Sequence, residues 1–269
     1  MNVLYKYCDQ KGIEIILRTL ELKLPYISQV NDPIECLPFM YCPDDKAALK
    51  KLYLSVSQRE KKPLPVDYKQ KIETGEIRKK LEEGIRKTQE DLNAKGCLLS
   101  VSETAKNTVM WAHYADKHEG AVIGIDFDSV FPDTNEKRGI LMDAVSYSKD
   151  RPQINILDNP EGNIPLEAIE KAVRTKSVDW EYEKEFRAVF FVDFLEILQQ
   201  QGLALLKDLD DKKTWFLRLN PVSIREVIFG LYTDESLKLA IRKLIERQDL
   251  QHVKLRQAEE SETYTLNLK

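Results

Sequence analysis

The sequence predicts an α+β fold: a mixed, mainly antiparallel split β-sheet core with flanking helices and a helical insertion. Short apolar or alternating segments typical of strands occur near both ends of the chain and in its middle. Helical segments lie between them without the regular strand–helix alternation of a doubly wound parallel sheet. We expect the 269 residues to form a single domain, 1–269, with the helical insertion at about 44–95. The core is expected to resemble that of ADP-ribosyltransferases, for reasons that depend on the motifs below.

The composition is that of a cytoplasmic protein, with 42% hydrophobic and 32% charged residues. No apolar run approaches about 18 residues, and the first residues lack the basic and apolar regions of a signal peptide, so no membrane association is expected. The four cysteines form no CxxC pair and are expected to be reduced thiols. Because the chain has only three histidines, we expect no metal centre built from histidine.

The first half of the chain predicts two short strands, at 3–7 and 21–24, with a helix between them. Asp9 is placed to cap this helix, and apolar residues follow it at helical spacing. The next motif is QVNDPIE at 29–35, where Asn-Asp-Pro is strong turn chemistry. It is either a structural turn or a loop that presents Asn31, Asp32 or Glu35 to a ligand.

The insertion at 44–95 is expected to be helical and largely exposed. Residues 46–95 contain 14 Lys or Arg against 8 Asp or Glu, so the segment is basic in a chain of formal net charge −4. It is either a surface that meets a nucleic acid or protein acceptor or an exposed helical region whose charges maintain solubility.

The middle of the chain predicts a strand at 97–103 with alternating serines, a helix at about 107–118 and a strand at 121–127. The helix carries the densest cluster of special residues in the chain, MWAHYADKHEG. Its first face holds Met110, His113 and Tyr114, and its second holds Trp111, Tyr114, Ala115 and His118. This helix is either a buried aromatic face or the wall of a pocket.

The later part of the chain is organised around residues 176–192, KSVDWEYEKEFRAVFFV. A strand that starts at the acids places Glu181, Glu183, Glu185 and Arg187 on one face. Such a row of carboxylates requires opposing cations or a ligand, unless it is a solvated edge. The other expected elements are a strand at 144–148, a helix opened by Asn163 and Pro165, an excursion at 193–215, strands at 223–230, 252–255 and 264–268, and a helix at 234–248.

Several common catalytic motifs do not occur. The sequence lacks GxGxxG, GxxxxGK[ST], GxSxG and HExxH, which mark dinucleotide folds, P-loops, α/β-hydrolases and zincins. The blocks LYKY, NDPIE, MWAHYADKHEGAVIGID, KSVDWEYEKEFR and VIFG, in this order, resemble the bacterial domain of unknown function 2971 family. This resemblance implies no activity.

The chain is also similar, more remotely, to ADP-ribosyltransferases. The first block is LYKY, the second is SVS with Ser100 and Ser102, and the third is EYEKE. The first block lacks the family's Arg or His, Val101 stands where Thr is usual, and no glycine-rich nicotinamide cradle is evident. The resemblance implies an NAD-consuming transferase or glycohydrolase with NAD as its substrate. Its candidate catalytic residues are Glu185, Glu183, His113 and Tyr114, and its candidate NAD-binding residues are Tyr5, Lys6, Ser100, Ser102, Trp111 and Arg187.

Two other functions fit the same residues. In a metal-dependent nuclease or phosphodiesterase, Asp126, Asp128, Glu183 and Glu185 would hold Mg²⁺, with Lys184 or Arg187 assisting. In a non-catalytic binding module, the histidine, tyrosine and acids would form a buried polar network or recognise a partner.

Overall fold

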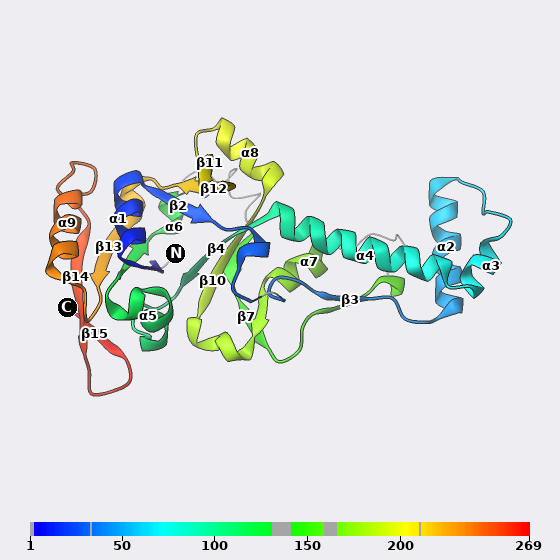
Figure 1. Ribbon diagram of the computed structural model, residues 1–269, viewed down its shortest axis with the longest axis horizontal. Helices are drawn as coiled ribbons and strands as arrows, with labels where there is room; N and C mark the ends of the chain where they lie inside the picture. Colours follow the sequence, from blue (N-terminus) through cyan, green and yellow to red (C-terminus); the bar gives the residue numbers. More distant parts are fainter. Residues whose placement is uncertain (1–2, 33, 131–140, 159–165, 210) are drawn as a thin grey trace. The chain divides into compact units, whose positions relative to one another are not determined.

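The computed structural model describes residues 3–32, 34–130, 141–158, 166–209 and 211–269 (Figure 1). The chain forms two compact units, each assembled from segments that are far apart in the sequence. The first unit comprises residues 1–26, 97–145 and 178–269, and the second comprises 27–96 and 146–177. The helical insertion expected at 44–95 lies within the second unit.

A mainly antiparallel sheet forms the centre of the first unit. In the described part of the chain its strand order is β15-β14-β13-β5-β1-β4-β10-β6. The pairs β1–β4, β1–β5, β13–β5, β10–β6 and β14–β15 are antiparallel, and β13–β14 is parallel. The expected α+β class is therefore confirmed. The strands are β1 (Leu4–Cys8), β4 (Gly96–Ser102), β5 (Ala121–Ile125), β6 (Leu141–Ala144), β10 (Glu185–Phe191), β13 (Ile224–Phe229), β14 (Lys254–Glu260) and β15 (Leu266–Leu268).

A smaller antiparallel sheet of the same unit has the order β11-β12-β2. Its strands are β2 (Glu21–Leu24), β11 (Ala204–Leu209) and β12 (Lys212–Arg218). The segment expected as an excursion at 193–215 thus contains regular structure, namely helix α8 (Val192–Gln200) and strand β11 with the start of β12. The other helices of this unit are α1 (Gln10–Thr19), α5 (Thr108–Tyr114), α6 (Phe127–Val130) and α9 (Glu235–Ile245).

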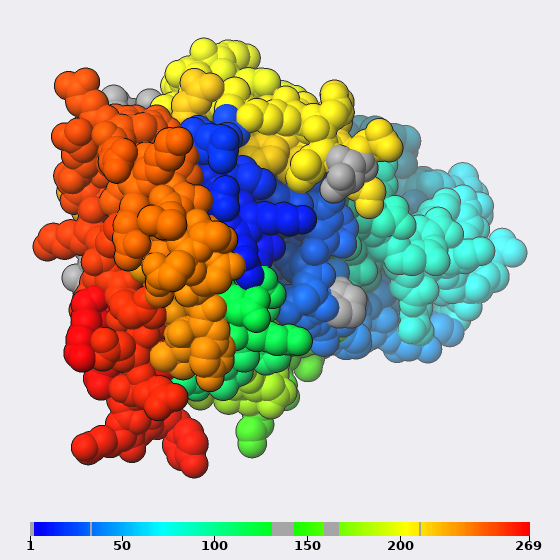
Figure 2. Space-filling model, turned by 60° about the vertical axis from the view of Figure 1, so that its left-hand side comes forward, coloured from blue at the N-terminus to red at the C-terminus, as the bar shows by residue number. Residues whose placement is uncertain are grey.

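Helix α1 begins where the sequence predicts it. Asp9 accepts a hydrogen bond from the amide of Gly12, 2.5 Å away, which satisfies one of the unpaired N–H groups at the helix start. Its apolar face is buried beside α9, which lies next to the N-terminal segments in Figure 2. Arg247, just after α9, donates to the carbonyls of Leu17 and Arg18 at the end of α1. These contacts fix the two helices to each other.

The alternation of side chains along the strands divides the core of the first unit into two clusters. The larger cluster contains Leu4, Leu99 and Ile123, together with the buried sides of α1, α8 and α9. The smaller cluster contains Tyr7 and Trp111 and the neighbouring aromatic side chains of α5. The residues expected at the functional site lie mostly around this smaller cluster.

The second unit is mainly helical. Its expected helices are present, and Asp45 caps the first of them through the amide of Ala48. A small apolar core, formed by Cys42, Leu49, Ile72 and Ile77, joins them. The elements of this unit are α2 (Lys46–Glu60), α3 (Tyr68–Glu73), α4 (Glu76–Lys95), α7 (Leu166–Val173) and the parallel strand pairs β3 (Phe39–Tyr41) with β8 (Gln153–Asn155) and β7 (Ser146–Ser148) with β9 (Thr175–Ser177). Asn163 and Pro165, the expected start of α7, lie outside the described residues.

The expected strand through the acids is wrong at its start. Residues Val178–Glu183 form a 3₁₀ helix, η5, and β10 begins only at Glu185. Lys184 joins them in the left-handed region, with φ of 44°. Because the backbone turns here, Glu181 and Glu183 do not share a strand face with Glu185 and Arg187.

The expected helix at 107–118 is wrong at its end. Helix α5 ends at Tyr114, and Asp116, Lys117 and His118 all have positive φ. This reversal lets the amide of Tyr232 bond to the carbonyl of His118, 3.0 Å away. A Cβ at position 230 would lie 2.1 Å from the same carbonyl oxygen, so the close contact between these two backbone segments requires glycine there.

Candidate functional site

Three neighbouring strands bring most of the predicted site residues into one region. Strand β4 lies between β1 and β10, and Tyr5 on β1 is directly opposite Ser102 on β4. We use the name polar cluster for Lys6, Ser102, Tyr114, Glu183, Glu185 and Arg187. The three sequence blocks that carry the remote resemblance to ADP-ribosyltransferases therefore supply residues to one part of the sheet.

Glu185 and Arg187 form a buried ion pair within β10. The guanidinium donates from Nε to Oε1 at 2.8 Å and from Nη2 to Oε2 at 2.9 Å. The side chains of Arg187 and Glu185 are 0% and 3% exposed. They are two residues apart on one strand, so they project from the same face. Both carboxylate oxygens of Glu185 bind Arg187, so the arginine is the counter-ion that this acid of the stretch requires.

Glu183 lies at the end of η5 and is also buried. The hydroxyl of Tyr114 donates to its Oε1 at 2.7 Å, a short hydrogen bond to a charged acceptor. The hydroxyl of Ser102 donates to the backbone carbonyl of Glu183 at 2.6 Å. The carboxylate is therefore held from α5, and its backbone is held from β4.

Helix α5 is positioned by Asn107. Its side-chain oxygen accepts from the amides of Val109 and Met110, and its side-chain nitrogen donates to the carbonyl of Tyr182. The same residue thus caps α5 and attaches it to η5, which carries Glu183. Sequence reasoning placed the helix start near Asn107 but missed the link to Tyr182, because the partner is 75 residues away.

Trp111 is part of the core. It is fully buried, its Nε1 donates to the carbonyl of Ala105, and its ring packs against Tyr7 and His118 at 5.5 and 5.9 Å between centroids. These contacts surround the indole with protein, so Trp111 is not placed to stack on a bound ring, as its expected NAD-binding role would require. Tyr114, which is only partly buried, is the remaining candidate for that role.

Lys6 is half-buried on β1, and its ammonium donates to the carbonyl of Ser100 at 2.9 Å. Burial lowers the pKa of Lys6, while nearby acidic groups, Glu185 and Glu183 among them, oppose this shift. The lysine is thus electrostatically coupled to both carboxylates. Ser100 contributes its backbone carbonyl to this contact.

Two predicted site residues lie apart from the carboxylates. The hydroxyl of Tyr5 donates to Glu226 on β13, at 3.1 Å, on the other side of β1 from β4. His113 is exposed, and its contact in the described structure is with the ring of Tyr114, 6.1 Å between centroids. The structure therefore brings Tyr114 and Glu183 together but gives His113 no direct contact with either glutamate.

Asp126 and Asp128 are not brought to the polar cluster. Asp126 follows β5, which is separated from β10 by β1 and β4, so the strands are roughly 14 Å apart at the usual inter-strand spacing. Asp126 pairs with Arg225 at 2.6 Å, and this contact lowers its pKa. In the described residues no group of three or more His, Cys, Asp or Glu side chains is placed to hold a metal ion.

The comparison with protein families concerns the same region. Residues 110–188 match the family described as "Protein of unknown function (DUF2971)". The DUF2971 match starts in α5 and ends in β10, so it includes Tyr114, Glu183, Glu185 and Arg187 but not β1 or β4. It supports the resemblance that the MWAHY and WEYEKEFR blocks indicate. No curated protein and no solved structure matches the chain significantly.

The DUF2971 description names no activity. Two other features of the chain bear on possible partners. Many cations of the basic segment 46–95 pair with local acids, as in Lys46–Glu73 and Lys80–Glu76. These acids are already counted in the net excess of basic residues, so the segment remains basic as a whole. Within the described ranges, no helix is both long enough and apolar enough to cross a membrane.

Proposed function

We propose that the chain is an NAD-consuming enzyme resembling ADP-ribosyltransferases, with the polar cluster as its active site. The observation that carries this proposal is the arrangement of the three sequence blocks on β1, β4 and the start of β10, which are neighbours in the sheet. Adjacent strands thus carry a lysine, a serine and a buried carboxylate, although none of the three blocks is close to another in the sequence.

The chemistry requires one fixed carboxylate. The bond between the nicotinamide nitrogen and ribose C1′ breaks, and nicotinamide leaves as a neutral molecule with the bonding electrons. The positive charge develops on the ribose ring, and an acceptor hydroxyl or water adds to C1′ and releases a proton. A buried carboxylate stabilises the cation and orients a ribose hydroxyl or the acceptor.

Glu183 is the better candidate for this carboxylate. Glu183 accepts on Oε1 from the hydroxyl of Tyr114, whose side chain is partly exposed and can meet a ligand, whereas Glu185 is bound to the fully buried Arg187. In this proposal Arg187 is the structural counter-ion of Glu185, and Lys6 is left to bind the pyrophosphate of NAD. The basic segment 46–95 would meet a nucleic acid or protein acceptor.

The test is the release of nicotinamide from NAD by the full chain, alone and with DNA, RNA or protein acceptors. Glu183→Gln should lower the rate about 10²- to 10³-fold, the usual effect of removing one group that stabilises transition-state charge. Glu181→Gln is the matched control, because Glu181 is an exposed acid of the same 3₁₀ helix. It should leave the rate unchanged.

Wild-type protein that releases no nicotinamide with any of these acceptors would contradict the proposal. Equal losses for Glu183→Gln and Glu181→Gln would contradict the assignment of the carboxylate.

The second candidate is a non-catalytic binding module in which the polar cluster is a structural network. The burial of the Glu185–Arg187 pair favours this alternative, because in some proteins a buried ion pair fixes one packing arrangement without taking part in chemistry. Under this alternative, Glu183→Gln would lower the melting temperature, and the wild-type chain would have no activity for the substitution to reduce.

A further inference from the structure

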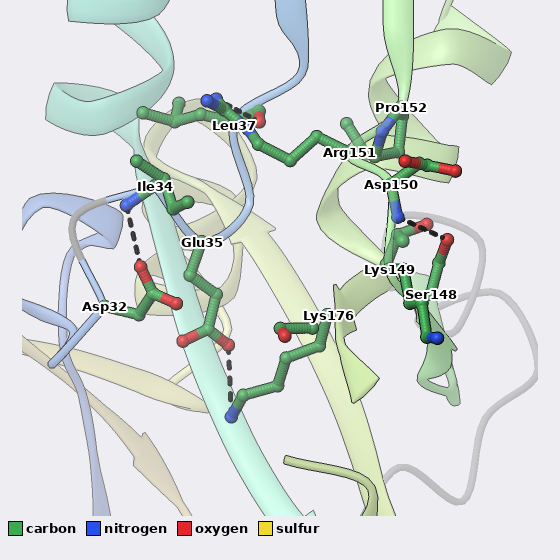
Figure 3. A pocket seen from close by; sticks show the side chains of 13 residues that line it. Asp32, Ile34, Glu35, Leu37, Ser148, Lys149, Asp150, Arg151, Pro152 and Lys176 are labelled. Carbon is green, nitrogen blue, oxygen red and sulfur yellow. Dashed lines mark hydrogen bonds and ion pairs between the residues drawn. The ribbon is translucent and has the colours of Figure 1, made fainter. Parts of the chain in front are cut away.

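The NDPIE loop lines a small pocket of the second unit together with Arg151 (Figure 3). The pocket has a volume of about 200 Å³. Glu35 of the loop forms a buried ion pair with Lys176, at 3.4 Å between Oε1 and Nζ. Arg151 donates from Nη2 to the carbonyl of Leu37 at 2.9 Å. These contacts tie the loop to its neighbours and favour the structural interpretation of the motif over the ligand-presenting one.

The edge of the smaller sheet in the first unit is a surface of another kind. In the part of the chain that the structure describes, β11 is an edge strand that pairs with β12 alone (Figure 1). The amide of Arg218 donates to the carbonyl of Leu203 at 2.8 Å. Because hydrogen bonds alternate along an antiparallel pair, every second residue from Leu203 onward bonds to β12. The backbone groups that point away from β12 are those of Ala204, Leu206 and Asp208, and no other described backbone group bonds to them.

The charged side chains of β11 do not protect this edge. Edge strands commonly carry a charged residue, often lysine, that repels an approaching strand. The ammonium of Lys207, however, pairs with Glu21 of β2 and lies 5.4 Å from the centre of the Phe216 ring. Asp208 pairs with Lys213, its direct neighbour on β12, at 3.0 Å. Both charges are thus directed inward over their own sheet and compensated there.

The sequence at 203–209, LALLKDL, is complementary to itself in one antiparallel register. In this register a two-fold axis passes beside Leu206, which is 36% exposed. An axis beside Lys207 or Asp208 would place identical charges directly opposite each other, which is destabilising. With the axis at Leu206, no charge faces a like charge, and every leucine faces an apolar side chain or the methylene stem of a lysine. The facing pairs are Leu206–Leu206, Leu205–Lys207, Ala204–Asp208 and Leu203–Leu209.

We propose that two copies of the chain associate through β11, in antiparallel pairing centred on Leu206. The pairing joins the two small sheets into one continuous sheet. It satisfies the outward backbone groups of Ala204, Leu206 and Asp208 in each copy, because outward residues that face each other exchange two hydrogen bonds. It also covers the exposed Leu206 side chains. This association is independent of NAD chemistry at the polar cluster.

The first experiment is disulfide cross-linking of the full chain under mild oxidation, followed by electrophoresis without reductant. Leu206→Cys places two thiols on the axis, where facing Cα atoms are about 5.5 Å apart, within the range that a disulfide spans. The four native cysteines are buried. We expect Leu206→Cys to form the covalent dimer at least about tenfold faster than two controls, since a preformed pair holds its thiols at high effective concentration.

The two controls separate a specific register from random collision. Lys207→Cys lies on the same strand but faces Leu205 of the second copy, so its thiols are not opposite each other. Leu239→Cys lies on α9 and is more exposed than Leu206, at 60%. Its cross-linking rate gives the rate for chance encounters of an exposed thiol.

The second experiment measures the association of the unmodified chain by sedimentation velocity. One strand pair makes a small, transient interface, so chain concentrations up to about 0.5 mM are needed. Leu206→Lys places like charges on the axis and removes the leucine contact, and should weaken association by about 5- to 30-fold. Leu239→Lys is the matched control and should leave it unchanged. Circular dichroism of each variant verifies that it is folded.

Three outcomes would overturn the proposal. The first is a wild-type chain that stays monomeric over the whole concentration range. The second is an equal cross-linking rate for Leu206→Cys, Lys207→Cys and Leu239→Cys, which would indicate random collision. The third is a dimer that Leu206→Lys does not weaken, which would place the interface elsewhere on the molecule.

Discussion

The Arg187→Met substitution tests how strongly the buried ion pair determines the stability of the first unit. The guanidinium is fully buried and donates to both oxygens of Glu185. Removing it leaves a carboxylate in the interior without this counter-ion. The expected loss is about 3–5 kcal/mol in the free energy of unfolding. For a domain of this size, that corresponds to a decrease of roughly 6–20 °C in melting temperature.

The assay is urea unfolding, followed by circular dichroism, of the wild type, Arg187→Met, Glu185→Gln and the double variant. The two side chains are in direct contact, so we expect the double variant to be more stable than the sum of the single losses predicts. A loss below about 1 kcal/mol for Arg187→Met would refute the reasoning. Strict additivity would show that the two groups stabilise the protein through other partners.

Substitutions at two further residues test the position of α5 and the loop after it. Asn107→Ala removes the helix cap and the bond to Tyr182, and should cost about 2 kcal/mol in urea unfolding. Asn107→Asp keeps the cap acceptor and should cost less; equal costs would argue against the capping role. Burial lowers the pKa of His118 from its ordinary value of 6.5. Below about pH 6.5 the unfolded state therefore binds more protons than the folded state, and the stability of the folded protein falls as the pH drops. His118→Gln should therefore reduce the fall in melting temperature between about pH 7 and pH 5. If the melting temperature of the variant falls as steeply as that of the wild type, another group causes the pH dependence.

Local sequence patterns predicted the helices and strands that are determined by residues near one another in the chain. Asp9 and the apolar spacing after it located α1, because a cap and a buried face are both encoded within one or two turns. The helices of 44–95 and the strands β1, β4, β5 and β13 of the main sheet followed from the same kind of signal, whereas β6 was not predicted. The predicted ends of helices and strands were wrong where contacts with distant residues determine the backbone conformation. Residues 116–118 leave the helix because the carbonyl of His118 bonds to Tyr232, more than a hundred positions away.

The candidate site shows the same division. The sequence singled out Glu183, Glu185 and Arg187, since acids and an arginine concentrated before a buried strand need partners. It treated the two glutamates as equivalent. In the structure the 3₁₀ helix before Glu185 places them differently: Glu185 binds Arg187 within β10, and Glu183 accepts a hydrogen bond from Tyr114.

The sequence by itself determined the fold class, the α1 cap, the helical insertion and the residues around which a site could form. It did so because caps, periodicity and charge clustering are properties of neighbouring residues. Only the tertiary structure decided that Trp111 is a core residue, that Asp126 pairs with Arg225 and that Arg151 lines a pocket with the NDPIE loop. These facts depend on contacts between segments that are distant in the chain, and no local pattern records which strand or loop will be adjacent.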